Sequence, residues 1–117
     1  MVIVREMTEV QSTDMSNGAE IVGVLKRVLV GPSDGAPTFA VRLFTLTPGG
    51  HTPAHTHPFE HGVVVLRGRG TVLTTTGLVP IQEGSVVFVP SGDYHQFRNG
   101  GPERLDFLCI IPVQHEI

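Results

Sequence analysis

Residues 49–68 read GGHTPAHTHPFEHGVVVLRG, which places four histidines between glycines, three of them within residues 55–61, and follows them with a run of valines. His55, His57 and His61 all have odd numbers, so on an extended strand their side chains would point to one face. Imidazole is the commonest metal-binding side chain near neutral pH, because one ring nitrogen keeps a lone pair in the neutral form. The stretch therefore predicts a sheet face that binds a metal ion.

A later histidine completes the set. His95 begins a later predicted strand, and an antiparallel sheet can bring a later strand back beside an earlier one. We predict one site for a divalent ion, and its four candidate ligands are His55, His57, His61 and His95. His51 lies in a Gly/Pro-rich turn near the mouth of this site, and His115 lies near the C-terminal end; both are interpreted as solvated.

One carboxylate competes with His61. Glu60 precedes it directly and would turn toward the metal if Pro58 introduced a bulge. Without a bulge, strand alternation points Glu60 away, as an exposed charge or a charge at a subunit interface. Glu60 as a ligand therefore remains an alternative.

The composition fits one all-β domain. A chain of 117 residues can build one hydrophobic core, and its 14 glycines and 9 prolines suit short strands joined by tight turns. Apolar runs predict strands at 24–30, 39–47, 61–66, 70–76, 79–82, 85–89, 95–98 and 105–111, with no sustained helical period. We expect an antiparallel barrel or jelly roll over residues 23–117, preceded by an N-terminal arm of residues 1–22 that pairs with a neighbouring sheet.

Charge and hydropathy exclude several classes of partner. The net charge is −3 and the lysines and arginines form no run, so neither nucleic acid nor a membrane surface is expected as a partner. The first residues lack the apolar region of a signal peptide, and no segment is long enough to span a bilayer. A single cysteine, Cys109, fits a reducing compartment, so we expect a cytoplasmic protein.

Two motifs, in order, resemble those of the cupins. The first cupin motif is Gly, five residues, His-x-His, three or four residues, Glu, six residues, Gly; the second is Gly, five residues, Pro-x-Gly, two residues, His, three residues, Asn. The first is matched by Gly49, His55, His57, His61 and Gly68, with histidine at the Glu position. The second is matched in full by Gly84, Pro90, Gly92, His95 and Asn99. More narrowly, HTHPFEH at 55–61 and FLC at 107–109 resemble small single-domain manganese-binding cupins of the Thermotoga type, whose site is all histidine.

The resemblance implies a cupin β-barrel, also described as a double-stranded β-helix or jelly roll, and it implies manganese. The chemistry of imidazole alone also permits Fe, Co, Ni, Cu or Zn. Four neutral ligands leave the full dipositive charge on the ion, and in an octahedral site they leave two positions open for an oxidant or substrate. A closed structural zinc site is the alternative.

Strand parity predicts an apolar pocket beside the ion. Its expected lining is Val63, Val65, Phe107, Cys109 and Ile111. Such a pocket would accept a small apolar, aromatic or alkenyl molecule, and would hold a phosphate or sugar only if Arg42 or Arg98 pointed inward. Cys109 is interpreted as a small buried hydrophobe, with oxidation near the metal as the alternative.

These features predict a metal-dependent oxidoreductase, either dioxygenase-like or peroxide-using. Tyr94 and His51 are candidates for proton transfer near the mouth of the site, although the sequence does not fix the direction of their side chains. Two alternatives are a non-enzymatic cupin that binds or senses a small molecule, and a metal-dependent isomerase, for which the sequence reveals no acid–base pair. We expect a homodimer formed through sheet edges and outer faces, such as the face that carries Val64 and Leu66.

Overall fold

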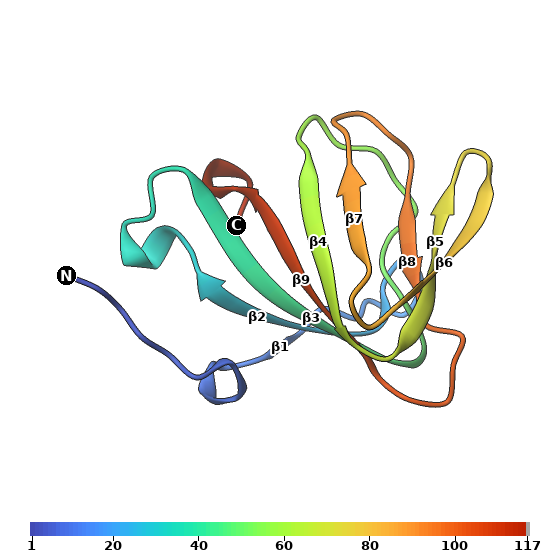
Figure 1. The fold of residues 1–117 in the computed structure, drawn as a ribbon, viewed down its shortest axis with the longest axis horizontal. Coiled ribbons are helices and arrows are strands. Elements are labelled where there is room, and N and C mark those ends of the chain that lie inside the picture. Colours follow the sequence, from blue (N-terminus) through green and yellow to red (C-terminus); the bar gives the residue numbers. More distant parts are fainter. Residues whose placement is uncertain (117) are drawn as a thin grey trace.

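A computed structural model describes residues 1–116, which contain β-strands and short 3₁₀-helices but no α-helix (Figure 1). The strands are β1 (Thr13–Asp14), β2 (Val22–Val30), β3 (Phe39–His51), β4 (His61–Arg67), β5 (Arg69–Thr74), β6 (Gly77–Gln82), β7 (Val86–Val89), β8 (Gln96–Arg98) and β9 (Leu105–Pro112). The 3₁₀-helices are η1 (Met7–Glu9), η2 (Pro32–Asp34) and η3 (Val113–His115). The predicted all-β, single-domain architecture is confirmed.

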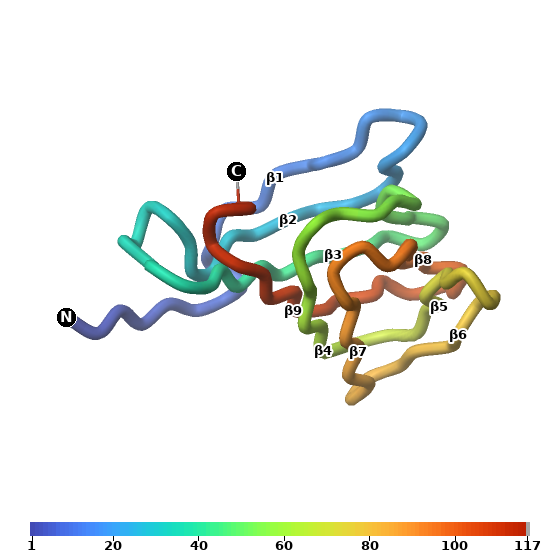
Figure 2. Tube along the Cα trace, turned by 90° about the horizontal axis from the view of Figure 1, so that it is seen from above, coloured from blue at the N-terminus to red at the C-terminus, as the bar shows by residue number. Residues whose placement is uncertain are grey.

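The long strand β3 organises the sheet. It pairs with β2 on one side and with β9 on the other, and its last residue, His51, pairs with Arg98 of β8. The strand order is β6-β5-β8-β3-β9-β4-β7, every pairing is antiparallel, and β2 and β1 follow outside β3. The trace in Figure 2 curls back on itself. The strand β3 takes part in two sections of the sheet, because residues 39–46 pair with β9 and His51 pairs with β8.

The hydrophobic core lies inside this curl, where β4 and β9 pair. Val63 faces Cys109 and Val65 faces Phe107 across the two strands, and all four side chains are buried. The Phe107 ring also stacks on Phe97 of β8, with ring centroids 4.8 Å apart. Burial at alternate positions of β4 is the pattern expected of a strand with one face on the core.

One predicted turn is wrong. Residues Pro48–Gly50 were expected to end a strand at residue 47, whereas β3 continues through them to His51. Pairing with β2 carries the strand across, with a register shift between Val22 and Val24. Gly50 suits this close approach, since a Cβ atom there would lie 2.8 Å from the backbone oxygen of Gly23.

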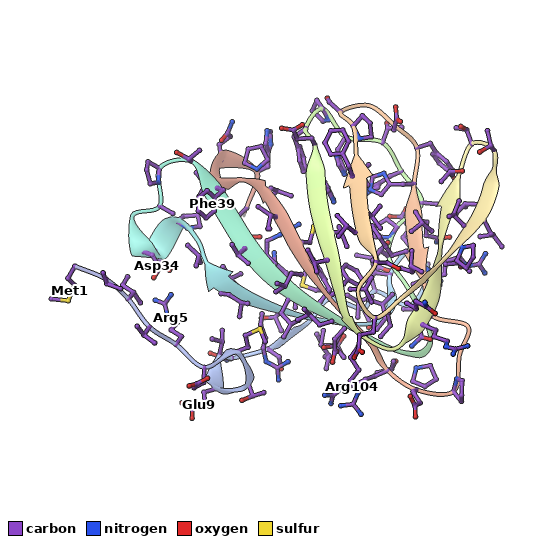
Figure 3. All side chains as sticks on the ribbon, in the orientation of Figure 1. Met1, Arg5, Glu9, Asp34, Phe39 and Arg104 are labelled. Carbon is purple, nitrogen blue, oxygen red and sulfur yellow. The ribbon has the colours of Figure 1, made fainter. Side chains whose placement is uncertain are left out.

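The N-terminal arm lies along its own barrel. Thr13–Asp14 pairs with β2 of the same chain, and Arg5 donates a hydrogen bond to the backbone oxygen of Leu29 and forms an ion pair with Asp34. Figure 3 shows Arg5 and Asp34 near each other, at the end of the molecule that carries Met1. Pairing of this arm with a second chain stays a prediction.

No helix within residues 1–116 is long and apolar enough to cross a membrane.

Candidate metal centre

The loop between β3 and β4 brings histidines from distant parts of the chain together. The backbones of His55 and His95 form an isolated antiparallel bridge, and each N–H donates to the other residue's carbonyl oxygen at 3.1 Å. Next to this bridge, one ring nitrogen from each of His55, His57 and His95 lies within 4.8 Å of the other two. These three histidines could therefore hold a metal ion.

Backbone carbonyls orient two of the rings. His57 Nδ1 lies 2.8 Å from the Phe59 oxygen, and His95 Nδ1 lies 2.9 Å from the Asp93 oxygen. A carbonyl oxygen only accepts, so each Nδ1 carries the hydrogen and each Nε2 keeps its lone pair. This is the usual arrangement behind a metal-binding histidine, in which the distal nitrogen is fixed by a hydrogen bond.

His61 lies beside the cluster, but its ring nitrogens are not among the three ligand atoms that lie within 4.8 Å of one another. It begins β4, and its buried ring stacks on His57 with centroids 4.2 Å apart and planes 6° apart. Its Nδ1 lies 3.3 Å from Cys109 Sγ. His61 as the fourth ligand stays a prediction.

Two buried nitrogen atoms without hydrogen-bond partners show whether the site suits a metal ion. Within residues 1–116, the Nε2 atoms of His57 and His61 are buried and lack hydrogen-bond partners. A buried polar atom without a partner costs about 1 to 3 kcal/mol, so such atoms usually mark a ligand or an ordered water. A divalent ion bound by these imidazoles would satisfy them, and the site therefore fits a metal.

Burial keeps these rings neutral, as metal ligands must be. It lowers the pKa of His61 from 6.5 to about 3, with a further contribution from neighbouring His57 and His95. Burial also lowers the pKa of His57 and of His55, and nearby histidines add to the effect on both. Around neutral pH each ring can thus offer a lone pair.

The competing ligand and the candidates for proton transfer lie outside the cluster. Glu60 is exposed, as strand alternation from His61 predicts. His51 is partly buried and contacts the Thr52 oxygen and the Gln96 side chain, whereas Tyr94 is 39% exposed. Neither His51 nor Tyr94 lines the cavity that holds the histidine cluster.

A cavity of about 220 Å³ adjoins the histidines. Its lining includes Phe107, Cys109 and Ile111, together with Phe44 and Phe97. Val63 and Val65 instead lie in the packed core behind the wall, 1% exposed each.

Charged side chains also line this cavity, and one of them is Arg42, which was named above as a possible exception to an apolar pocket. Arg42 points inward and is 7% exposed, whereas Arg98 is exposed. Glu116 accepts from Arg42 Nη1 at 3.0 Å and from Lys26 Nζ at 2.7 Å, within a buried ion-pair cluster. The sequence carried a signal for Arg42, since on β3 it lies two residues from apolar residues that face inward. It carried no signal that Glu116 lies beside Arg42.

Cys109 joins the ion-pair cluster to the histidines. Its Sγ accepts from Arg42 Nη2 at 3.0 Å and also contacts His61 Nδ1. Burial raises the pKa of the Cys109 thiol, which keeps it protonated around neutral pH. Cys109 was interpreted as a small buried hydrophobe; the side chain is buried, but its sulfur also has polar partners in Arg42 and His61.

His115 was interpreted as solvated, and this is wrong. The residue is half-buried, lines the cavity, and stacks on Phe59 with ring centroids 4.1 Å apart. Phe59 in turn stacks on His57 at 4.0 Å. A continuous stack of aromatic rings, His115–Phe59–His57–His61, therefore forms one wall of the site.

A family model described as "Cupin domain" matches residues 42–111, which include all four candidate ligands. The chain belongs to the cupin family. The curled antiparallel sheet and the histidine cluster of this cupin agree with the two sequence motifs.

Three relatives show how varied similar cupins are. The structure of the polyketide cyclase RemF from Streptomyces resistomycificus has a TM-score of 0.89 and 27% identity, with 97% of this chain and 80% of that chain covered. The 1-methylthio-D-xylulose 5-phosphate methylsulfurylase of Rhodospirillum rubrum is 33% identical over 68% of this chain and 51% of its own length. The oxalate-binding protein of Thermotoga maritima is 36% identical over 60% of this chain and 61% of its own length.

This cupin spans about half the length of the curated relatives it matches, with aligned shares of 43% to 61% of their lengths. The relatives include enzymes and binding proteins, so what they support in common is the fold. The reaction and the ligand must be argued from this chain's own residues.

Proposed function

We propose that this cupin is a metal-dependent enzyme that oxidises a small apolar, aromatic or alkenyl substrate, in a reaction of dioxygenase-like or peroxide-using type. The observation that carries the proposal is the pair of buried, unpartnered Nε2 atoms of His57 and His61 in side chains that line a largely apolar cavity. Polar atoms of this kind are costly in an apolar wall unless a ligand uses them.

His55, His57 and His95 would hold the metal, with His61 as the fourth ligand. A bound divalent ion would supply Lewis acidity and, for a redox-active metal, the electron-transfer chemistry that oxidation by dioxygen or peroxide needs. Manganese is proposed from the resemblance, and iron, cobalt, nickel, copper and zinc remain compatible with an imidazole site.

The aromatic side chains would bind and orient the substrate. Phe44 and Phe107 stack at 5.6 Å, Phe97 packs on Phe107, and all three line the cavity. Such walls favour a flat or apolar molecule and exclude water from the reacting atoms.

A non-redox reaction is the second candidate, as an isomerase or as a ring-closing enzyme. It needs groups that move protons, and the structure places His115 and Lys26 in the cavity wall, with Glu116 bonded to Lys26. The similarity to a polyketide cyclase over nearly the whole chain supports the same candidate.

The test begins with protein purified without a metal-affinity tag and analysed for its elements. The protein is then reconstituted with each candidate metal and given phenolic and alkenyl compounds while dioxygen and peroxide are measured. Consumption of oxidant with formation of an oxidised product is expected.

The other outcomes separate the candidates. Formation of a product without consumption of oxidant would favour the non-redox reaction over oxidation. Compounds that bind but never react, with every metal, would make this cupin a binding or sensing protein and refute catalysis.

A further inference from the structure

We propose that the cavity contains a subsite for a carboxylate, formed by Lys26 and Arg42, and that the natural ligand is therefore a small monocarboxylate with an apolar or aromatic body. This inference deepens the proposed function and rests on it for the metal centre in the same cavity.

The first argument is the balance of charge. Lys26 and Arg42 both line the cavity, and their side chains are 11% and 9% exposed. Glu116 is the one carboxylate bonded to either of them within residues 1–116, and no aspartate or glutamate in this part of the chain lines the cavity. Among residues 1–116, one positive charge is thus left without a carboxylate partner in a largely buried place, where an unpaired charge is costly.

The second argument is the count of hydrogen-bond donors. An ammonium group has three N–H donors and a guanidinium five. Lys26 uses one donor on Glu116, while Arg42 donates to the Cys109 oxygen, to Cys109 Sγ and to Glu116. The remaining donors of both groups have no acceptor in the described part of the chain, so they are free to bind an oxyanion.

The third argument is that the two cations share a face. Lys26 of β2 pairs with Phe44 of β3, and Arg42 lies two residues along β3 from Phe44. Arg42 also sits over the Phe44 ring, 5.0 Å from its centroid. A carboxylate between the cations would leave the body of the ligand against the aromatic wall.

Cys109 connects this subsite to the metal centre. Its sulfur contacts both Arg42 and His61, so the cationic and histidine parts belong to one cavity rather than to two. A ligand with its carboxylate at Lys26 and Arg42 can therefore present its other end to the histidines.

The test measures binding of phenylacetate and of its neutral isostere phenylacetamide by titration calorimetry. The measurement uses protein loaded with zinc and is repeated after removal of the metal with EDTA. Phenylacetate should bind at least about tenfold more tightly than phenylacetamide, because hydrogen bonds to a charged partner are stronger than neutral ones. The preference should survive loss of the metal.

Two variants should change the affinity for phenylacetate in opposite directions. Lys26→Met removes a cation but keeps an apolar stem, and should weaken phenylacetate binding roughly tenfold. Glu116→Gln frees both cations and should strengthen it several-fold, whereas mere damage to the cavity would weaken binding in both variants. Arg27→Met is the matched control, since Arg27 is the next residue of β2 and its Nε donates to the Val10 oxygen.

Each remaining outcome overturns one claim. Equal affinity for the acid and the amide, or a Glu116→Gln variant that folds but binds phenylacetate less tightly, would refute the subsite. A preference for the acid that disappears with EDTA would place the carboxylate on the metal and also refute it. A preference that persists in protein with no catalytic turnover would instead contradict the proposed enzyme and leave the subsite intact.

Discussion

The protonation of His61 should make the metal-free protein sensitive to mild acid. In the unfolded chain this imidazole takes up a proton near pH 6.5, whereas in the folded chain it does so only near pH 3. Between these values the unfolded state binds more protons, so the free energy of unfolding decreases as the pH falls. Replacing His61 with phenylalanine keeps a ring in the stack and removes the titration.

The size of the effect follows from the two pKa values. From pH 7 to pH 5, protonation of the unfolded chain alone corresponds to a loss of about 2 kcal/mol. The ring borders a cavity open to solvent, and screening reduces the expected loss to about 1 to 2 kcal/mol. Wild-type protein should lose this much more stability than His61→Phe over the same pH interval.

The assay is urea unfolding at pH 7 and at pH 5 in EDTA, followed by circular dichroism because the chain has no tryptophan. Phe59→Leu serves as the control, since it disturbs the same aromatic stack without changing a titratable group. This control should lower stability equally at both pH values. If wild-type and His61→Phe proteins lose the same stability on acidification, the assignment of a buried, neutral His61 is wrong.

Five further substitutions test the site and the fold. His95→Ala should weaken metal binding at least about tenfold in elemental analysis after dialysis, whereas Glu60→Gln should retain the metal unless the carboxylate is a ligand after all. Asn99→Ala should lower the free energy of unfolding by about 3 kcal/mol in urea titrations, since it strips two backbone carbonyls of their donor. Gly68→Ala should cost about 2 kcal/mol or more in the same assay, because φ is 89° and a Cβ would strike a backbone oxygen; a smaller loss would contradict that geometry. Phe88, 64% exposed on β7, should contribute to the predicted homodimer, so Phe88→Ser should lower the mass measured by light scattering; a wild-type monomer would refute the dimer.

The histidine cluster could be predicted because local rules determine most of it. The spacing of His55 and His57 predicted that they would lie together, although both lie in the loop between β3 and β4 rather than on a strand, and the antiparallel return brought His95 back beside His55. Glu60, directly before the first residue of β4, is exposed. Strand ends were less predictable, because β3 continues through Pro48–Gly50 only when β2 lies beside it, and that pairing is a tertiary contact.

The ion-pair cluster could not be predicted, because its members are far apart in the sequence. Lys26 and Glu116 are separated by 90 residues and Arg42 and Glu116 by 74, and no periodic pattern relates such positions. Seen alone, each residue reads as an ordinary surface charge. Only the folded chain shows that they meet at the cavity wall.

The groups of the proposed carboxylate subsite and of the cavity wall lie partly outside the residues matched by the family model. The family match covers residues 42–111, which contain the four histidines, whereas Lys26 lies before it and His115 and Glu116 lie after it. Lys26 of β2 and His115 of η3, both outside the matched residues, line the same cavity, and Glu116 forms an ion pair with Lys26. Within residues 1–116 their printed contacts reach the histidines through Arg42, Cys109 and the aromatic stack, so changes there should alter which molecule binds while leaving the histidine cluster in place. On this reasoning, relatives with the same histidine cluster but different flanking segments should differ in substrate while binding the same kind of ion.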